Sequence, residues 1–405
     1  MAISKGIFKK VVVTPETTYG VLPAANSASA QLMRRVTSAF NLKKDTYESN
    51  EINSTLQTVD LRTGTRSAEG SLAGELSPGT YSKQFEAVLA KDFVAPAPIT
   101  GLSITIAANG TLWNVTRTAG SWVADGVLVG SVVRFTGGTL NAANSANNVL
   151  IVALTATVLT VKVLSATNLV AEGTAVASVT MTVAGKQTQI PQSGHTDKSF
   201  AVEEWYSDVA VSETFTGVKF GSVNVSLPAT GLVTVDFSAM GRNLERIDTT
   251  QYFTAAAQPT TTGLLTAVNG ALVVNGVPVA VVTSATINTE RTLEAAMAVG
   301  NLFSTEVFTG KIKVTGSLSV YFQDSTFSNY FSNETPVSLV VALTTGTVKN
   351  GDVMSFCLPK IKITDFNKAD AELGIVAEVP FTAVINDVTG TGLPQTTMMV
   401  QDSAA

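Results

Sequence analysis

The sequence contains few side chains of the types that carry out catalysis, and their positions do not suggest a site. His195 is the only histidine among 405 residues, and it lies in the turn-rich segment QSGHTDKS. A single histidine cannot build a histidine-based metal cluster, and it leaves a Ser/His/Asp triad without alternative bases. Cys357 is the only cysteine, so no intrachain disulfide can form, and the surrounding SFCLPKIKI favours a buried strand residue over a nucleophile. We therefore expect a solvated loop histidine and a buried thiol.

The carboxylates offer no better catalytic arrangement. Glu203 and Glu204 are neighbours in a predicted strand, so their side chains point to opposite faces and cannot act as an acid/base pair. The segment DFNKADAE carries a sparse set of oxygen ligands at Asp365, Asn367, Asp370 and Glu372. It lacks the glycine at which an EF-hand loop turns, so we interpret it as a solvated turn, with a calcium site as the minor alternative.

Motifs that bind nucleotides or catalytic zinc are missing from the sequence. It has no GxxxxGK[ST], GxGxxG or HExxH pattern, so neither a phosphate-binding loop nor a zinc-protease helix is predicted. We predict no catalytic residues, no cofactor and no metal, and therefore a protein that is not an enzyme.

The composition favours a protein that assembles. Lys, Arg, Asp and Glu make up 14% of the chain, whereas roughly 25% is typical of soluble proteins. These residues normally cover the surface, so their shortage indicates that much of the folded surface contacts other protein. The formal net charge is −5, and no basic segment is interleaved with aromatic residues, which argues against tight nucleic-acid binding. Apolar runs are too short for a secretory signal or a membrane span, so we expect a soluble protein of a reducing cytoplasm.

Most periodic stretches alternate with period two, which is the pattern of half-buried strands. The clearest is KIKVTGSLSVYF at 311–322, where every second residue is apolar or glycine. In FTGVKFGSVNVSL the apolar parity shifts between Phe220 and Val223, which predicts a β-bulge at Gly221. Further strands are predicted at 200–206, 232–238, 278–287, 337–345, 354–363 and 378–385. The pattern predicts an all-β fold.

The segment 101–185 differs in composition from the rest of the chain. It contains only five charged residues, and Pro96 and Pro98 precede it. Its apolar stretches LSITIA, TLWNVTR, SVVRFT, NVLIVAL, VLTVKVL and VASVTMTV are typical of short strands joined by Gly/Asn turns. We interpret it as a small β-domain inserted into a larger domain formed by 1–100 and 186–405.

Two short helices are expected beside the strands. SPGTYSKQFEAVLAKDF at 77–93 offers Ser77 as a cap, Pro78 at the first helical position and an apolar stripe at helical spacing. This pattern predicts a helix over 78–92. A shorter helix is predicted at 325–331, where aromatic residues follow a capping serine.

The most specific text of the sequence lies between residues 15 and 92. It reads PETTYGVLPA, then MRRVTSAFNLKKDTYESNEI, then TVDLRTGTRSAEGSLAGELSPGTYSKQFEAVL. This order resembles the N-terminal part of siphophage tail tube proteins. Later, GSWVADGVLVGSVVRFTGG and NNVLIVAL are similar to a small barrel-like insert of the same family, and KSFAVEEWYSD is similar to the strand that resumes the tube domain.

The resemblance implies a tail tube β-sandwich whose sheets join those of neighbouring subunits into a hexameric ring, with rings stacked into the hollow tail. The insert would be a small β-barrel or immunoglobulin-like domain on the tube exterior. The implied partners are other copies of the chain, the tape measure protein, the tail terminator, distal tail proteins, and genomic DNA that passes through the lumen without specific binding. No membrane is implied, and the protein would be located in the virion tail.

The segment 43–76 is rich in charges of both signs, poor in apolar runs and too long for an ordinary turn. We predict an arm that contacts the next ring through complementary charges, with a solvated hairpin as the alternative. The candidate contact residues are Lys43, Lys44, Asp45, Tyr47, Glu48, Glu51, Asp60, Arg62, Arg66, Glu69 and Glu75. Residues 186–405 contain 20 acidic and 12 basic residues, which would allow an acidic lumen that repels phosphate and lets DNA slide.

The alternative function is a β-rich adhesin or carbohydrate-binding protein of the virion or cell surface. In that case Trp113 and Trp122 of the insert would stack on sugar rings. Tryptophans in such strands are more often part of a core, so the tube subunit is the favoured hypothesis. An enzyme of unusual type would need a constellation of side chains that the sequence does not contain.

Overall fold

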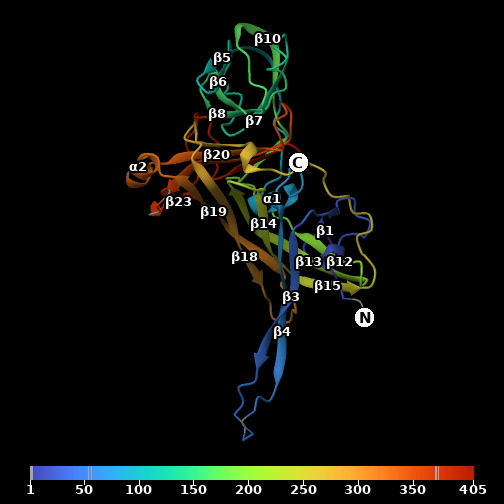
Figure 1. Cartoon of the computed structure of the whole chain (residues 1–405). Coiled ribbons are helices and arrows are strands. Elements are labelled where there is room, and N and C mark those ends of the chain that lie inside the picture. The colour runs from blue at the N-terminus through green and yellow to red at the C-terminus, as the bar shows by residue number, and fades with distance from the viewer. Residues whose placement is uncertain (1–2, 53, 56, 370–371, 373) are drawn as a thin grey trace.

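The computed structural model describes residues 3–52, 54–55, 57–369, 372 and 374–405. Antiparallel strands dominate it, beside two α-helices and two 3-10 turns, η1 (Gly6–Phe8) and η2 (Ala267–Asn269), so the predicted all-β class is confirmed. Figure 1 shows three parts in succession: a small barrel at one end, a layered body in the middle, and a long two-stranded hairpin that projects from the other end.

The main sheet of the body has the strand order β3-β4-β14-β13-β18-β19-β23, with every neighbouring pair antiparallel. These strands are β3 (Thr37–Glu48), β4 (Leu61–Glu75), β14 (Thr234–Gly241), β13 (Val211–Pro228), β18 (Val282–Ala296), β19 (Glu306–Tyr321) and β23 (Val376–Ala383). Alternate residues face the core, as the period-two pattern predicts; Leu72, Phe237 and Val223 form one buried row across three neighbouring strands.

Strand β13 belongs to two sheets. Its first half pairs with β12 (Phe200–Tyr206) and β15 (Asn243–Asp248), and β12 continues the smaller sheet through β1 (Lys9–Pro15) to β2 (Gln31–Leu32). Its second half pairs with β14 and β18 in the main sheet. The register against β14 shifts between Phe220 and Ser222, which leaves Gly221 as the extra residue and confirms the predicted bulge.

A second layer covers the buried face of the main sheet. Its strands are β16 (Gly270–Val274), β17 (Val277–Pro278), β20 (Val337–Thr344), β21 (Val353–Ile363), β24 (Met399–Asp402) and β11 (Lys186–Gln189), with the short β22 (Asn367–Ala369) beside β23. Helix α1 (Ser82–Leu89) lies between the layers, where the Phe85 ring is 5.5 Å from that of Phe237 and 6.0 Å from that of Phe356. Helix α2 (Thr326–Ser332) lies at the edge of the body near the predicted 325–331.

Helix α1 is shorter than the predicted helix over 78–92. Residues 77–80 form a turn instead of a first helical turn, because the Ser77 and Thr80 hydroxyls bond to each other at 2.6 Å and the Gly79 amide donates to the Asp402 carboxylate at 2.9 Å. The helix ends at Leu89, and the capping residue Ala90 that follows has a φ of 56°, in the left-handed region.

The barrel closes in the order β10-β5-β6-β9-β8-β7. Its strands are β5 (Ile99–Asn109), β6 (Leu112–Arg117), β7 (Val132–Gly137), β8 (Val149–Leu154), β9 (Val158–Val163) and β10 (Glu172–Val183). Its apolar interior is continuous with the outer face of the second layer, where Val340, Cys357 and Met399 are buried against it. Polar contacts reinforce the joint: Ser355 Oγ donates to the Gly130 carbonyl at 2.8 Å.

Candidate assembly surfaces

The main sheet has one buried face and one open face. On the open face, Asn224 lies between Asp236 of β14 and Asn288 of β18, and Thr315 of β19 continues the same row. These side chains are exposed or half-buried, because no further layer of the described chain covers them. The neutral polar residues of this face include Ser71, Ser222, Asn224, Ser226, Thr234, Ser238, Thr286, Asn288, Thr315 and Ser317.

Charges on the open face are few and mostly acidic. The carboxylates are Glu69, Glu75, Asp236, Glu290 and Glu378, and the ammonium groups are Lys43, Lys311 and Lys313. Glu290 lies directly opposite Lys313, and partial burial raises the pKa of Asp236. The result is a wide hydroxyl- and amide-rich surface with a small excess of negative charge.

Both edges of the main sheet keep free backbone groups. β3 pairs only with β4, and the structure gives its outer edge no partner strand among the described residues. At the other edge, β23 covers only Val314–Tyr321 of β19, so Glu306–Lys313 pair with β18 alone. Unpaired strand edges bind other strands readily, and lone soluble molecules normally protect them.

The β3–β4 hairpin continues past the body into the projection of Figure 1. We call residues 43–66 the arm, since Phe40 is the last buried residue before this segment and Ala68 is the first buried residue after it. The predicted range 43–76 was therefore too long. Residues 68–75 lie in the main sheet and pair with β14, and Ala68 and Leu72 among them are buried.

Several of the predicted contact residues pair within the hairpin. Lys43 Nζ is 2.8 Å from Glu69 Oε1, Arg62 Nε is 2.7 Å from Asp60 Oδ2, and the Thr65 hydroxyl donates to Asp45 at 2.5 Å. These exposed pairs stabilise the hairpin by little, because water screens them. The Tyr47 ring lies over Gly64, and a Cβ at position 64 would overlap this ring.

Other predicted contact residues lack a charged partner within the described chain. Lys44 lies directly opposite Arg66, so two positive charges share one face of the arm. Glu48 and Glu51 form no ion pair with any described residue. Glu69 and Glu75 belong to the open face of the main sheet instead of the projecting part.

The base of the arm is held by the β18–β19 turn. The Arg66 amide donates to the Leu302 carbonyl at 2.9 Å, and the Arg242 guanidinium lies over the Phe303 ring at 5.5 Å from its centroid. Next to this turn Lys219, almost fully buried, bonds at 2.5 Å to Asp197 and at 2.6 Å to Glu306. Sequence reasoning missed this cluster, because its members are far apart in the chain.

The candidate catalytic residues do not form a site. His195 is exposed in its loop, and Cys357 is fully buried, which raises the pKa of its thiol to about 12. Glu203 accepts bonds from the Tyr252 and Phe253 amides, while Glu204 pairs with Lys9 on the other face. Asp370 lies outside the described residues, and the described part of the chain holds no cluster of three or more acidic, histidine or cysteine side chains placed to bind a metal.

The two tryptophans of the barrel are not arranged as a sugar platform. Trp122 is fully buried, so its ring cannot stack on a ligand. Trp113 is partly buried, and its Nε1 donates to Asn168 at 2.9 Å. Neither observation favours the adhesin alternative.

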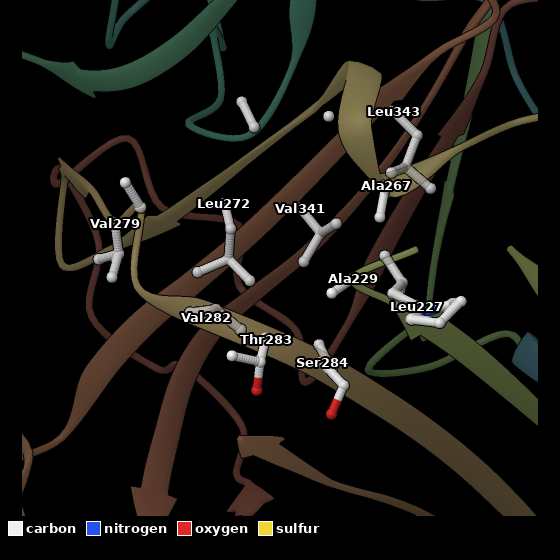
Figure 2. A pocket seen from close by; sticks show the side chains of 15 residues that line it. Leu227, Ala229, Ala267, Leu272, Val279, Val282, Thr283, Ser284, Val341 and Leu343 are labelled. Atoms are coloured by element: carbon white, nitrogen blue, oxygen red, sulfur yellow. The ribbon is translucent and has the colours of Figure 1, made fainter. Parts of the chain in front are cut away.

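Two apolar pockets open where β16 and β17 approach β18 and β19. The first, of about 220 Å³, is lined by Leu227, Leu272 and Val341 among others, and Figure 2 shows that the hydroxyls of Thr283 and Ser284 point away from it. The second, of about 540 Å³, lies beside α2. Apolar linings of this kind suit packing against an apolar surface better than they suit catalysis.

None of the described helices is long and apolar enough to cross a membrane. A family model described as phage tail tube protein matches residues 9–383, which is nearly the whole chain. A search of curated proteins found no match to the sequence.

Proposed function

The chain belongs to the phage tail tube protein family, as its sequence resemblance predicted, and we propose that its copies close into hexameric rings that stack into the hollow tail of a siphophage. A structural role in the phage tail follows from the family itself. The observation that carries the ring proposal is the main sheet, which has one polar open face and free backbone at both edges.

Ring closure would satisfy those edges. The outer edge of β3 in one subunit would pair with the free part of β19, Glu306–Lys313, in the next, so that the sheet continues around the ring. A closed sheet has no edge left to aggregate. The low content of charged residues is consistent with extensive contact of this kind.

The open face would line the lumen. Its hydroxyls and amides offer DNA only neutral contacts, and the excess of carboxylates, including Asp236 and Glu290, would repel phosphate. The face has too few cations to hold a polyanion. Genomic DNA would therefore slide through during ejection without specific binding.

The arm would reach the adjacent ring, with Lys43, Lys44, Asp45, Tyr47, Glu48, Glu51, Asp60, Arg62 and Arg66 as its candidate contact residues. The two positive charges of Lys44 and Arg66, which face each other in the arm, support a contact with the adjacent ring. An acidic surface of another copy would neutralise both charges. The barrel would lie on the tube exterior. The remaining partners would be the tape measure protein, the tail terminator and distal tail proteins, and the chain would be made in the host cytoplasm.

Shortening the arm tests the proposal while keeping the sheet intact. Replacing residues 45–65 by Asn-Gly joins the opposed residues Lys44 and Arg66 with a two-residue turn. We expect rings or monomers but no stacked tubes in negative-stain images of the variant, and stacked tubes in those of the unaltered chain. Intact tubes from the variant would refute the role of the arm, and an unaltered chain that stays monomeric at high concentration would refute ring assembly.

A further inference from the structure

The pocket beside α2 is a large apolar recess that the described chain leaves uncovered. It has a volume of about 540 Å³ and is lined by residues of β17, the end of β19 and α2, among them Phe327 and Tyr330. Its rim is unusually apolar for a free surface, since Val277 is 62% exposed and Tyr321 is 55% exposed. Exposed apolar recesses of this size mark contact sites for a partner.

A second uncovered apolar group lies at the tip of the arm. Ile52 is fully exposed, Val59 is 55% exposed and Leu61 is 51% exposed, within a hairpin that is otherwise mostly polar or charged. Figure 1 shows the arm leaving the body at the end opposite the barrel, whereas α2 lies on the barrel side of the body. The pocket and the apolar tip of one molecule therefore lie too far apart to meet each other.

We propose that the pocket beside α2 receives the apolar arm tip of a second copy of this chain. The inference rests on the proposed stacking of rings and assigns the surface that the arm contacts. When two different sites at opposite ends of the molecule contact each other, every added copy still offers a free site, so the stack can grow along the tube axis. An arm-to-arm contact would use the same site on both copies and would stop at a dimer. Burial of Val59 and Leu61 would supply the main driving force.

Charges flank the two surfaces in a complementary way. Glu48 lies directly opposite Leu61 in the hairpin and forms no ion pair within the described chain. At the pocket, the Lys368 ammonium lies 4.5 Å from the centroid of the Phe322 ring and has no carboxylate partner among the described residues. Asp324, the acidic residue of the pocket, is already engaged, because it accepts a bond from the Thr326 amide at 2.8 Å.

A charge swap tests the contact. Glu48→Lys and Lys368→Glu should each cause a loss of tube formation, measured by sedimentation and negative stain, and the double variant should restore tubes. Glu245→Lys on β15, away from both surfaces, serves as the matched control and should assemble like the unaltered chain. Two single variants that assemble normally, or a double variant no better than either single variant, would overturn the proposed contact.

Footprinting of tubes of the unaltered chain is an independent test, because it uses no variant that could fail to fold. Hydroxyl-radical oxidation should modify Tyr321 and Phe322 in the unassembled chain, and this modification should be lost in tubes together with that of Leu61. Tubes in which Tyr321 and Phe322 stay as reactive as in the free chain would overturn the pocket assignment while leaving the tube function standing. A chain that forms no tubes at all would instead contradict the proposed function.

Discussion

Gln401 on β24 is one of the polar links between the barrel and the body, and replacing it should destabilise the whole chain. The residue is fully buried, and its Nε2 donates to the Val132 and Ala184 carbonyls at 2.8 Å each. Its Oε1 accepts from the Val132 amide at 2.8 Å. The side chain thus binds two neighbouring barrel strands, at the start of β7 and just after the end of β10.

Gln401→Leu removes these bonds while keeping an apolar stem of similar length. The Val132 carbonyl still accepts from the Ala184 amide at 2.9 Å, so two buried groups lose their partner: the Val132 amide and the Ala184 carbonyl. At about 1–3 kcal/mol for each unsatisfied group, the free energy of unfolding should fall by about 2–6 kcal/mol. That is a large share of the roughly 5–15 kcal/mol typical of folded proteins.

Urea unfolding of the unassembled chain, followed by tryptophan fluorescence, measures this change because Trp122 is buried in the barrel. The matched control is Gln192→Leu, an exposed glutamine whose single bond goes to the Gln395 carbonyl at 3.1 Å, and it should change stability by no more than about 0.5 kcal/mol. If Gln401→Leu were as stable as this control, the barrel would be a loosely attached appendage and the reasoning would be refuted.

Two further predictions concern buried ionisable groups. The Cys357 thiol, with its pKa raised to about 12 by burial, should not react with a thiol reagent in the folded chain and should react fully in denaturant; fast labelling of the native protein would contradict its burial. Burial raises the pKa of Asp402 above the 3.8 of an ordinary aspartate. At a pH between 3.8 and the pKa of the folded state, Asp402 therefore binds a proton in the folded chain but not in the unfolded chain. This contribution to stability is lost as the pH rises through the folded pKa. The free energy of unfolding of the unaltered chain, relative to that of Asp402→Asn, should therefore fall with rising pH from about pH 4. A difference between the two chains that does not depend on pH would contradict the raised pKa.

The strand content was predictable because alternation survives in the sequence wherever one face is buried. Strand β4 was harder to recognise, and its second half was assigned to the arm. The assignment rested on its charges of both signs and its lack of apolar runs. Its small residues are required by packing, because a Cβ at Gly70 would overlap the Phe40 ring and one at Gly74 would overlap the Tyr81 hydroxyl. The sequence alone does not reveal this reason, because Phe40 meets Gly70 only once β3 and β4 are paired.

The assembly surfaces were only partly predictable for the same physical reason. The charges of the arm were visible as a local cluster, but Lys219 meets Asp197 and Glu306, which lie 22 and 87 residues away in the chain. The pocket beside α2 likewise needs β17, β19 and α2 to be folded together before it exists. Period-two patterns fix which face of a strand is apolar, but not which strand lies beside it.

The most direct test of the central claim is a cryo-EM reconstruction of the assembled full-length chain. The open polar face of the main sheet, marked by Asp236 and Glu290, should line a continuous lumen, with β3 of one subunit paired to β19 of the next. Tubes in which this face points outward, or an assembly without a lumen, would contradict the claim.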